Sequence, residues 1–421
     1  MKHVILGNGP AGVVAAETLR KAAPGDAITL VGDEPGPSYS RMAIPYLLSG
    51  SIDEQGTWLR KDSGHFARLR ITLKEGRAAS LDAAARAVKL ESGEVLPFDR
   101  VLVATGSRPN RPPIPGLDLP GVHPCWTLED ARAIAKRAQK GSRVLQMGAG
   151  FIGCIIMEAL AERGVDLVLV EMGERMVPRM MPPGASELIR AWCERRGIRV
   201  VTGAQVKEIR SAGGRLDVSI SDGQVLAADL VISATGVTPN TAFLEGSGVA
   251  CDQGVLVDER MQTNVAGVYA AGDVARAPEF DTGNRIAYAI QPTAVEQGRV
   301  AALNMAGRDA VSPGALAMNV LDTLGLVSAS FGQWHGVPPA QGGSSAELRD
   351  AERFRYLRLE FQDDRLIGAT SLGHTDHVGV IRGLIQGRIR LGEWKAKLAA
   401  DPTKLMDAYL ARAQAASQAV T

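Results

Sequence analysis

The sequence has few cysteines and no long hydrophobic run. Its four cysteines, Cys125, Cys154, Cys193 and Cys251, are scattered, and no two of them stand in a C-x-x-C or C-x-x-x-x-C pair. A redox disulfide, an iron–sulfur cluster and a zinc cluster therefore have no basis in the sequence. We expect Cys154 to be a buried packing residue. No apolar run reaches the ~18 residues that a membrane span needs, so we expect no membrane segment.

The chain also lacks an excess of charge of either sign. Its formal net charge is +1, which gives no reason to expect nucleic acid or an anionic membrane as a partner. The first predicted strand begins at Lys2 and leaves no room for a signal peptide, so a cytoplasmic protein is expected. With 421 residues, 45% hydrophobic residues and 47 glycines, the composition fits an α/β protein of two or three domains.

The most informative features of the sequence are two glycine motifs. An apolar strand at residues 4–6 leads into Gly7-x-Gly9-x-x-Gly12, then a small-residue helix, then a second apolar strand at 28–31 that ends close to Asp33. In such a strand–turn–helix–strand unit the glycines let the backbone approach a pyrophosphate, which lies at the helix N-terminus. The acid can accept a ribose hydroxyl. We therefore predict a dinucleotide site here.

The same pattern occurs a second time. A strand at 143–147 leads into Gly148-x-Gly150-x-x-Gly153, a helix at 151–162 and a strand at 167–170 that ends at Glu171. The segments VLVATGSRPN (101–110) and LVISATGVTPN (230–240) repeat behind the two motifs in the same order. The sequence thus indicates a duplicated module with two dinucleotide sites, which suggests two different cofactors.

Several segments around the first motif are predicted to complete its site. Arg41 lies in a Pro/Gly-rich loop, and its planar guanidinium suits a pyrophosphate. Residues 71–97 alternate like a β-meander with a turn at Ser92-Gly93, and residues 205–228 form a second meander. The strand at 100–104 is closed by Thr105-Gly106 beneath a cofactor.

The chain then returns toward the first module. Residues 267–275 are predicted to deliver Asp273 at the carboxyl end of a strand, where ligands collect in open α/β sheets. Gln291-Pro292-Thr293 opens a helix that runs to about residue 306, and its N-terminal dipole would stabilise negative charge on a flavin.

A third unit begins near residue 312. It has an apolar stretch at 316–331, a Gly/Ser-rich loop at 336–346, a hairpin at 354–372 and helices near 377–386 and 403–416. His374-x-x-His377 has no further ligand beside it, so we expect a structural or interface role and no metal.

These motifs resemble the two-dinucleotide-fold flavoproteins of the pyridine nucleotide–disulfide oxidoreductase superfamily. GNGPAG, ATGSRPN, GAGFIG, ATGVTPN and YAAGDVA match in the order of that family, over residues 1 to about 310. Within it, VGDEPGPSYSR is similar to the NADH-dependent ferredoxin and rubredoxin reductases and to the flavin part of NADH nitrite reductases. The resemblance implies an α/β fold with two Rossmann-like domains and a C-terminal α+β interface domain. The implied bounds are 1–112 with 242–310 for FAD, 113–241 for NAD and 311–421 for the interface domain.

The resemblance also implies the residues that hold each cofactor. For FAD these are Gly7, Gly9, Pro10, Ala11, Gly12, Asp33 or Glu34, Arg41, the backbone near Ala78, Thr105, Gly106, Gly272 and Asp273, beside the helix start at Gln291, Pro292 and Thr293 that the sequence itself predicts. For NAD they are Gly148, Gly150, Phe151, Ile152, Gly153, Glu171 and Gly236, with Gly236 near the nicotinamide. Glu171 favours NAD over NADP, because a carboxylate accepts ribose hydroxyls and repels a 2′-phosphate.

The chain departs from the family at two places. Disulfide reductases, peroxidases and thiol-type oxidases of the family carry one or two cysteines after the first unit, but residues 37–48 contain none. Related ferredoxin reductases usually place a lysine near Tyr46 and a glutamate near Ile155, and both are missing. Because both members of this ion pair are absent, neither is left as a buried charge without its partner. Glu158, one helical turn further on, is a candidate partial substitute.

Without a thiol, electrons must enter and leave through the flavin itself. The resemblance implies hydride exchange between NAD(H) and FAD, and single-electron exchange with an iron–sulfur protein or subunit. No side-chain acid or base is required, so no catalytic residue is named. The chain also resembles flavin subunits that link NAD to 2-oxoacid oxidoreductase complexes of the phenylglyoxylate dehydrogenase type. This implies a hetero-oligomeric complex or a homodimer. Two alternatives are a stand-alone NADH oxidase that forms peroxide and a flavoprotein that binds NADH as a conformational signal.

Overall fold

The computed structural model describes residues 1–418, with side chains up to residue 412. Contacts divide the chain into two compact units, each built from two separate stretches. Unit 1 comprises Met1–Asn110 and Val237–Ala315, and unit 2 comprises Arg111–Gly236 and the described residues from Leu316 on. Unit 2 thus contains residues 113–236 of the predicted NAD-binding domain and the described residues of the predicted interface domain from 316 on, while 237–241 and 311–315 lie in unit 1. Their separation into two domains stays a prediction.

Unit 1 is built on a five-stranded parallel sheet in the order β19-β7-β1-β2-β3. Its strands are β1 (Lys2–Leu6), β2 (Ala27–Gly32), β3 (Ile71–Glu75), β7 (Arg100–Val103) and β19 (Val268–Ala270). β1 lies between β2, the next strand in sequence, and β7, which the chain reaches much later. The strand order therefore reverses at β1, and in open α/β sheets ligands bind at the carboxyl ends of the strands at such a point.

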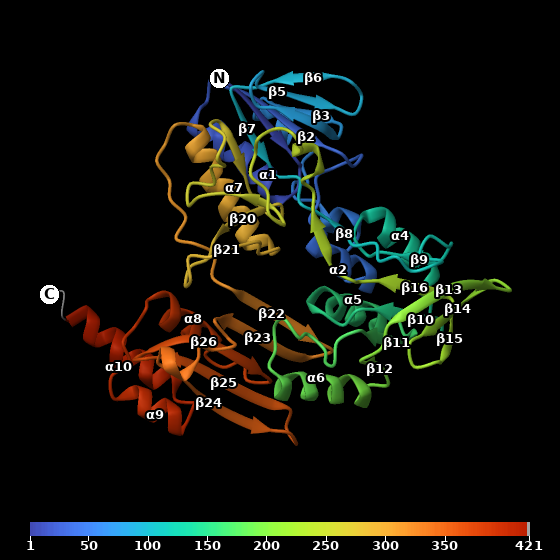
Figure 1. Ribbon diagram of the computed structural model, residues 1–421, viewed down its shortest axis with the longest axis vertical. Helices are drawn as coiled ribbons and strands as arrows, with labels where there is room; N and C mark the ends of the chain where they lie inside the picture. Colours follow the sequence, from blue (N-terminus) through green and yellow to red (C-terminus); the bar gives the residue numbers. More distant parts are fainter. Residues whose placement is uncertain (419–421) are drawn as a thin grey trace. The chain divides into compact units, whose positions relative to one another are not determined.

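Helices α1 (Pro10–Ala22) and α7 (Gln291–Met305) pack closely against each other in unit 1 (Figure 1). Small residues allow this approach, since a Cβ added at Gly298 would lie 2.4 Å from the carbonyl oxygen of Ala11. α1 begins with Pro10, whose fixed φ suits the first helical position, and has Arg20 and Lys21 in its last turn, where positive charge complements the helix dipole. The predicted helix opening at Gln291 is confirmed by α7.

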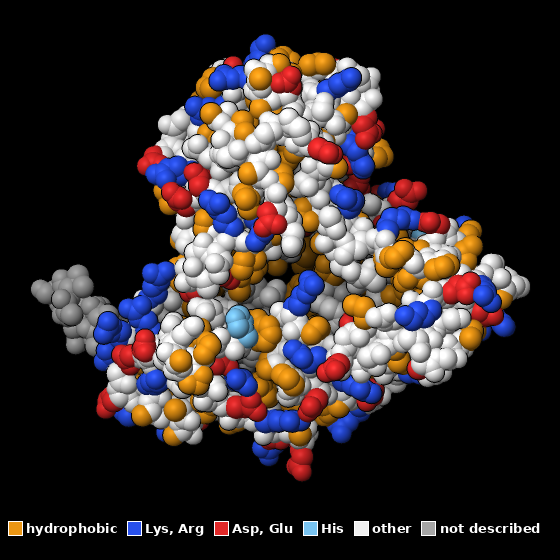
Figure 2. Space-filling model, in the orientation of Figure 1, with side chains coloured by type: hydrophobic (Ala, Val, Ile, Leu, Met, Phe, Trp, Pro, Cys, Tyr) orange, Lys and Arg blue, Asp and Glu red, His pale blue; other side chains and the backbone are white. Residues whose placement is uncertain are grey.

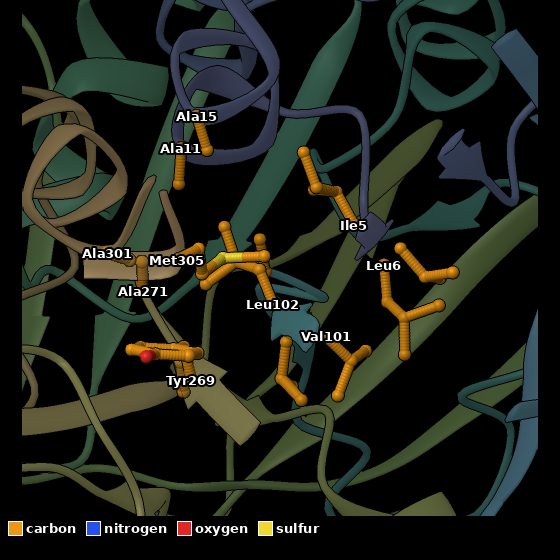
Figure 3. Packing of buried hydrophobic residues seen from close by; sticks show 14 of the residues in the cluster. Ile5, Leu6, Ala11, Ala15, Val101, Leu102, Tyr269, Ala271, Ala301 and Met305 are labelled. Atoms are coloured by element: carbon orange, nitrogen blue, oxygen red, sulfur yellow. The ribbon is translucent and has the colours of Figure 1, made fainter. Parts of the chain in front are cut away.

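Figure 3 shows part of the buried core of unit 1. Side chains from both helices and from the central strands gather in one apolar cluster, which includes Ile5, Leu6, Ala11, Ala15, Val101, Leu102, Tyr269, Ala271, Ala301 and Met305. Ile5, Leu102 and Met305 are fully buried, and each such side chain contributes roughly 1.5–3 kcal/mol through its removal from water. This core holds β1, and with it the start of the first glycine motif, in a fixed place.

The prediction of an antiparallel meander over residues 71–97 is wrong in its first part. β3 pairs with β2 in parallel and forms the edge of the main sheet. Only β4 (Ala78–Asp82), β5 (Ala87–Leu90) and β6 (Val95–Pro97) form the antiparallel meander. Only Ile71 of β3 is buried, because β3 is an edge strand. It therefore lacks the continuous apolar run that is typical of a strand buried within a parallel sheet. The turn at Ser92-Gly93 is confirmed between β5 and β6.

Shorter elements complete unit 1. Near the first motif lie η1 (Arg41–Ala43), α2 (Ile44–Ser49), η2 (Glu54–Thr57) and α3 (His65–Arg68). Two strands, β8 (Ser107–Pro109) and β17 (Val237–Pro239), pair antiparallel, and η3 (Ala242–Leu244) follows them. A small sheet contains β18 (Val255–Leu256), β20 (Ala275–Pro278) and β21 (Arg285–Ile286).

Unit 2 repeats the same parallel arrangement in the order β12-β11-β10-β16-β9. Its strands are β9 (Val122–His123), β10 (Arg143–Met147), β11 (Asp166–Glu171), β12 (Arg199–Thr202) and β16 (Leu230–Ser233). Its helices are α4 (Leu128–Arg137), α5 (Phe151–Glu162) and α6 (Pro183–Arg195). The predicted second meander is confirmed as β13 (Val206–Ala212), β14 (Arg215–Ile220) and β15 (Val225–Ala228). The duplication inferred from the sequence is thus also a duplication of structure.

The C-terminal part of unit 2 is an antiparallel sheet in the order β22-β23-β26-β25-β24. It comprises β22 (Met318–Thr323), β23 (Leu326–Gly332), β24 (Gly343–Asp350), β25 (Arg355–Gln362) and β26 (Arg365–Leu372), with the turn η4 (Pro339–Gln341). The hairpin expected at 354–372 is confirmed. The loop expected at 336–346 is too long, because β24 already begins at Gly343. Helices α8 (Val378–Gln386) and α10 (Leu405–Gln418) match the expectation, while α9 (Trp394–Ala400) was not predicted.

Lys and Arg side chains are interspersed with Asp and Glu on the face shown in Figure 2, in keeping with the formal charge of +1. Within residues 1–418, no helix combines the length and the apolar character that crossing a membrane requires.

Candidate functional site

The glycine turn of unit 1 (residues 7–12) joins β1 to α1 and has three glycines in different situations. Gly7 has φ +111°, and a Cβ there would lie 2.1 Å from the carbonyl oxygen of Ala104. A Cβ at Gly12 would lie 1.8 Å from the carbonyl oxygen of Gly7. The fold itself therefore requires these two glycines. Gly9 is different, because a Cβ there would meet no protein atom within 4 Å.

The glycine turn of unit 2 (residues 148–153) repeats this arrangement between β10 and α5. A Cβ at Gly148 (φ +98°) would lie 2.3 Å from the carbonyl oxygen of Ala234, and one at Gly153 would lie 2.4 Å from that of Gly148. Gly150 again faces open space. In both turns, no close contact within the protein requires a glycine at the middle position. The glycine leaves the backbone accessible beside a helix N-terminus. This fits a pyrophosphate, which approaches the backbone there.

Glu171 ends β11 beside the glycine turn of unit 2, as the sequence pattern requires. Its Oε2 accepts a hydrogen bond from the backbone N–H of Ala149 at 2.6 Å, and its Oε1 accepts one from Gly173 at 2.7 Å. The carboxylate is thus oriented at the edge of the turn by two amides, where each oxygen keeps a second lone pair for a ribose hydroxyl. The residues of unit 2 therefore fit the adenosine part of NAD.

The two candidate acids of unit 1 have partners of opposite charge. Asp33 forms an ion pair with Arg77 at 2.9 Å, and both side chains are exposed. Glu34 forms an ion pair with Arg41 at 2.5 Å and also accepts a hydrogen bond from the Tyr39 hydroxyl. Arg41 is therefore held beside the loop by Glu34. The assignment of Asp33 or Glu34 to a ribose, and of Arg41 to a pyrophosphate, stays a prediction.

Asp273 follows β19 at the carboxyl edge of the sheet of unit 1. Its Oδ2 accepts a hydrogen bond from the Ser107 hydroxyl at 3.0 Å. The pKa of the Asp273 carboxyl is raised, because the effect of burial exceeds the opposing effects of the hydrogen bond from Ser107 and the positive charge of Arg41. The residue before it, Gly272, has φ +80° and donates its N–H to the buried side chain of Gln297 in α7. A partly buried acid fixed in this way suits a hydroxyl of a cofactor.

Thr105 and Gly106 directly precede β8, which pairs with β17. The Thr105 hydroxyl donates to the carbonyl of Asn240 at 2.9 Å, and the Asn240 amide donates to the carbonyl of Thr105 at 2.9 Å. The repeated segments ATGSRPN and ATGVTPN thus pair with each other. The side chain of Thr105 is used within the protein, whereas Gly106 has φ +63° and faces open space. Gly236, with φ +94°, lies in unit 2.

The remaining FAD candidates lie at element ends in unit 1. Ala78 is the first residue of β4, and Gln291, Pro292 and Thr293 form the first turn of α7, where backbone N–H groups have no partner within the helix. The Ser40 hydroxyl donates to the side chain of Gln291 at 2.5 Å. Pro10 and Ala11 form the first turn of α1, and Phe151 and Ile152 that of α5. Their roles stay predictions.

Sequence reasoning missed three residues that hold these sites. Ser107 orients Asp273, and Gln297 holds Gly272. Gln146 donates its amide to the carbonyls of Gly148 and Gly153. The only signal for Gln146 was a polar residue inside an otherwise apolar strand. Ser107 and Gln297 carry no such signal, because a serine after a turn and a glutamine on a helix are common.

Three of the four thiols are poorly suited to redox chemistry. Cys125, Cys154 and Cys193 are buried, as expected for Cys154, and Cys251 is exposed. Burial raises the pKa of Cys125 and of Cys193 to about 12 and raises that of Cys154 as well, so these three stay protonated near neutral pH. Since the thiolate is the reactive form, buried neutral thiols are inert.

Glu158 lies on α5, and the two histidines lie in the C-terminal part of unit 2. The Glu158 carboxylate accepts a hydrogen bond from the backbone N–H of Leu324 at 3.2 Å, and burial with the neighbouring Asp322 raises its pKa to about 7. His374 is partly buried after β26, and His377 is exposed before α8. In the part of the chain that the structure describes, no three His, Cys, Asp or Glu side chains cluster as metal ligands would.

Comparison with known proteins gives a consistent result. The family model described as pyridine nucleotide-disulphide oxidoreductase matches residues 1–298. The epsilon subunit of NADH-dependent phenylglyoxylate dehydrogenase from Aromatoleum evansii is 32% identical over 405 residues, 95% of each chain. The ferredoxin–NAD(+) reductase component of a biphenyl dioxygenase system from Paraburkholderia xenovorans is 35% identical over 67% of this chain and 69% of its own. The structure of a ferredoxin reductase from Rhodopseudomonas palustris has a TM-score of 0.81 and 27% identity, covering 90% of this chain and 92% of its own.

Proposed function

Because the chain belongs to the pyridine nucleotide-disulphide oxidoreductase family, we propose that it is an FAD-dependent NAD(H) oxidoreductase that exchanges electrons with an iron–sulfur protein or subunit. FAD, when bound, would supply the step between two-electron hydride exchange with NAD(H) and single-electron exchange with the partner. The main structural support for the proposal is that the glycine turn occurs in both units. In each turn the first and third glycines are required by close contacts with protein carbonyls, whereas an added Cβ at the middle one, Gly9 or Gly150, would meet no protein atom within 4 Å.

The protein residues would bind and orient the two nucleotides. Gly9 and Gly150 leave the backbone open to a pyrophosphate, and Asp273 offers a carboxylate that Ser107 already orients. Glu171 would accept the ribose hydroxyls of NAD and would repel a 2′-phosphate. Hydride exchange needs no side-chain proton donor, so the role of the chain is position and electrostatics.

The mechanism we propose has no thiol step. Residues 37–48, where thiol-dependent members of the family carry cysteine, contain none. The three buried thiols have raised pKa values and would stay protonated. Electrons would therefore pass directly between the flavin and the one-electron partner.

The finer proposal is that the chain is the flavin subunit of a complex that oxidises a 2-oxoacid and reduces NAD⁺. The likeness to the Aromatoleum evansii subunit extends over 95% of both chains, while the likeness to the ferredoxin reductase component covers 67% of this chain. Affinity purification from the native host should then recover iron–sulfur subunits with the chain. A protein that purifies alone and rapidly reduces free ferredoxin would instead support a stand-alone ferredoxin reductase.

Turnover of the purified, FAD-loaded chain tests the general proposal. We expect NADH to drive rapid reduction of a viologen dye or a ferredoxin without oxygen, and slow peroxide formation in air. Fast peroxide formation with poor dye reduction would identify an NADH oxidase. Negligible turnover with persistent NADH-dependent absorbance changes would identify an NADH-binding flavoprotein with a signalling role.

A further inference from the structure

Gln146 is a fully buried polar residue directly beneath the glycine turn of unit 2. It lies on β10, whose residues 144 to 147 are all buried. Its Nε2 donates one hydrogen bond to the carbonyl of Gly148 at 2.9 Å and another to the carbonyl of Gly153 at 2.8 Å. Because both partners are carbonyls, the amide nitrogen must be the atom that faces them. One side chain thus links the first and the third glycine of the turn.

The matching position in unit 1 has no such link. Gln146 stands two residues before Gly148, and the residue two before Gly7 is Ile5, which is also fully buried. A Cβ at Gly153 would lie 3.1 Å from Nε2 of Gln146, and one at Gly12 would lie 3.3 Å from Cγ2 of Ile5. The two side chains therefore occupy the same place beneath similar turns, but only Gln146 can form hydrogen bonds.

The amide is not needed for packing and carries a cost. Oε1 of Gln146 is buried without a hydrogen-bond partner among residues 1–418. An unsatisfied buried acceptor destabilises a fold, and Ile5 shows that this turn can be built on hydrocarbon alone. We therefore attribute the glutamine at this position to the two hydrogen bonds that its Nε2 donates to the turn, and not to packing in the core.

We propose that Gln146 is a positioning residue that holds the glycine turn of unit 2 in its ligand-binding shape while the site is empty. The inference rests on the proposed function, in which NAD(H) enters and leaves in every cycle while FAD stays bound. FAD would stay on the turn of unit 1, whereas the turn of unit 2 would be empty between cycles, when only contacts within the protein such as those of Gln146 hold it. Preorganisation of this kind lowers the ordering cost of each binding event.

The test uses FAD-loaded protein with Gln146→Met, which keeps the length of the side chain but cannot donate, and Gln146→Ile, which copies unit 1. The probe is ADP-ribose, which carries the adenosine and pyrophosphate of NAD without the nicotinamide. Loss of the two hydrogen bonds should raise the Kd for ADP-ribose and the KM for NADH about tenfold. The kcat at saturating NADH should stay within about twofold, because only binding changes. FAD content should not change.

Leu145→Val serves as the control, since Leu145 is buried on the same strand and points to its other face. It should lower the melting temperature without changing the Kd for ADP-ribose. The inference is overturned if both Gln146 variants bind ADP-ribose as tightly as wild type, if Leu145→Val weakens binding equally, or if neither Gln146 variant folds. Failure of the proposed function would look different, because wild-type protein itself would then neither bind ADP-ribose nor oxidise NADH.

Discussion

Replacement of Gly150 by alanine should change the affinity for NAD without changing the stability of the fold. Gly150 has φ −75° and ψ −171°, a conformation open to alanine, and its added Cβ would meet no protein atom within 4 Å. Alanine would restrict the unfolded chain, which stabilises by about 0.4–1 kcal/mol, and would be a poorer helix N-cap by a similar amount. The two effects oppose each other. We therefore expect a melting temperature within about 4 °C of wild type.

Binding of NAD should respond very differently. The new methyl group would occupy the space that we assign to the pyrophosphate and would prevent close contact with the backbone amides. Loss of two charge-assisted hydrogen bonds costs about 3 kcal/mol or more, which corresponds to a Kd raised by a factor of roughly 100. Calorimetric titration with NAD⁺ gives the Kd directly, and the visible absorbance of the same sample gives the FAD content, which should be unchanged.

Gly148→Ala is the matched control in the same turn. Its φ of +98° is unfavourable for alanine, and its Cβ would lie 2.3 Å from the carbonyl oxygen of Ala234. The strain alone costs about 1–3 kcal/mol, so this variant should unfold at a clearly lower temperature. Tight NAD binding by Gly150→Ala, or a loss of stability equal to that of Gly148→Ala, would refute the assignment of the open space to a pyrophosphate.

Three further outcomes follow from the two sites and their surroundings. Glu171→Ala should raise the KM for NADH without release of FAD, and an unchanged KM would contradict its role at the ribose. Asp273→Ala should lower the FAD occupancy of purified protein, so a fully yellow variant would count against that contact. Replacement of all four cysteines by serine should leave dye reduction largely intact, and lost turnover in a folded, flavin-loaded variant would restore a thiol mechanism.

Glu158 gives a prediction about pH and stability. Its pKa is raised from 4.5 to about 7, so the native state holds the proton more tightly than the unfolded state does. Its contribution to stability is therefore fully present below pH 4.5 and is lost as pH rises to about 7. Because the side chain is only half-buried, solvent screening limits the effect to about 1 kcal/mol. Glu158→Gln should be more stable than wild type at pH 8 but not at pH 5 in urea unfolding. An equal difference at both pH values would argue against this.

The sequence predicted the parallel core of each unit because glycine spacing and apolar runs are local signals. The turns at Gly7 and Gly148, the strand before Asp273 and the helix after Gln291 lie where they were expected. β3 was misassigned because it is an edge strand with a single buried residue, Ile71, and lacks the apolar run of a buried parallel strand. Its pairing with β2 depends on contacts far from the strand itself.

The supporting residues of the site could not be predicted for a similar reason. ATGSRPN and ATGVTPN were identified as a repeat, but nothing local indicates that Thr105 and Asn240 bind each other across more than a hundred residues. The link between Ser107 and Asp273 is equally remote in sequence. Cooperation between distant residues depends on topology, which a single sequence does not display.

Anaerobic titration of the FAD-loaded protein with NADH tests the central claim most directly, with the visible flavin absorbance as the readout. If the flavin is the only redox centre in the chain, one NADH per flavin should bleach it completely, because each NADH supplies two electrons and FAD accepts two. A requirement for two NADH per flavin would reveal a second two-electron centre such as a disulfide, and an unbleached flavin would show that NADH does not reduce it. Either result would contradict electron transfer from NADH to the flavin without a thiol.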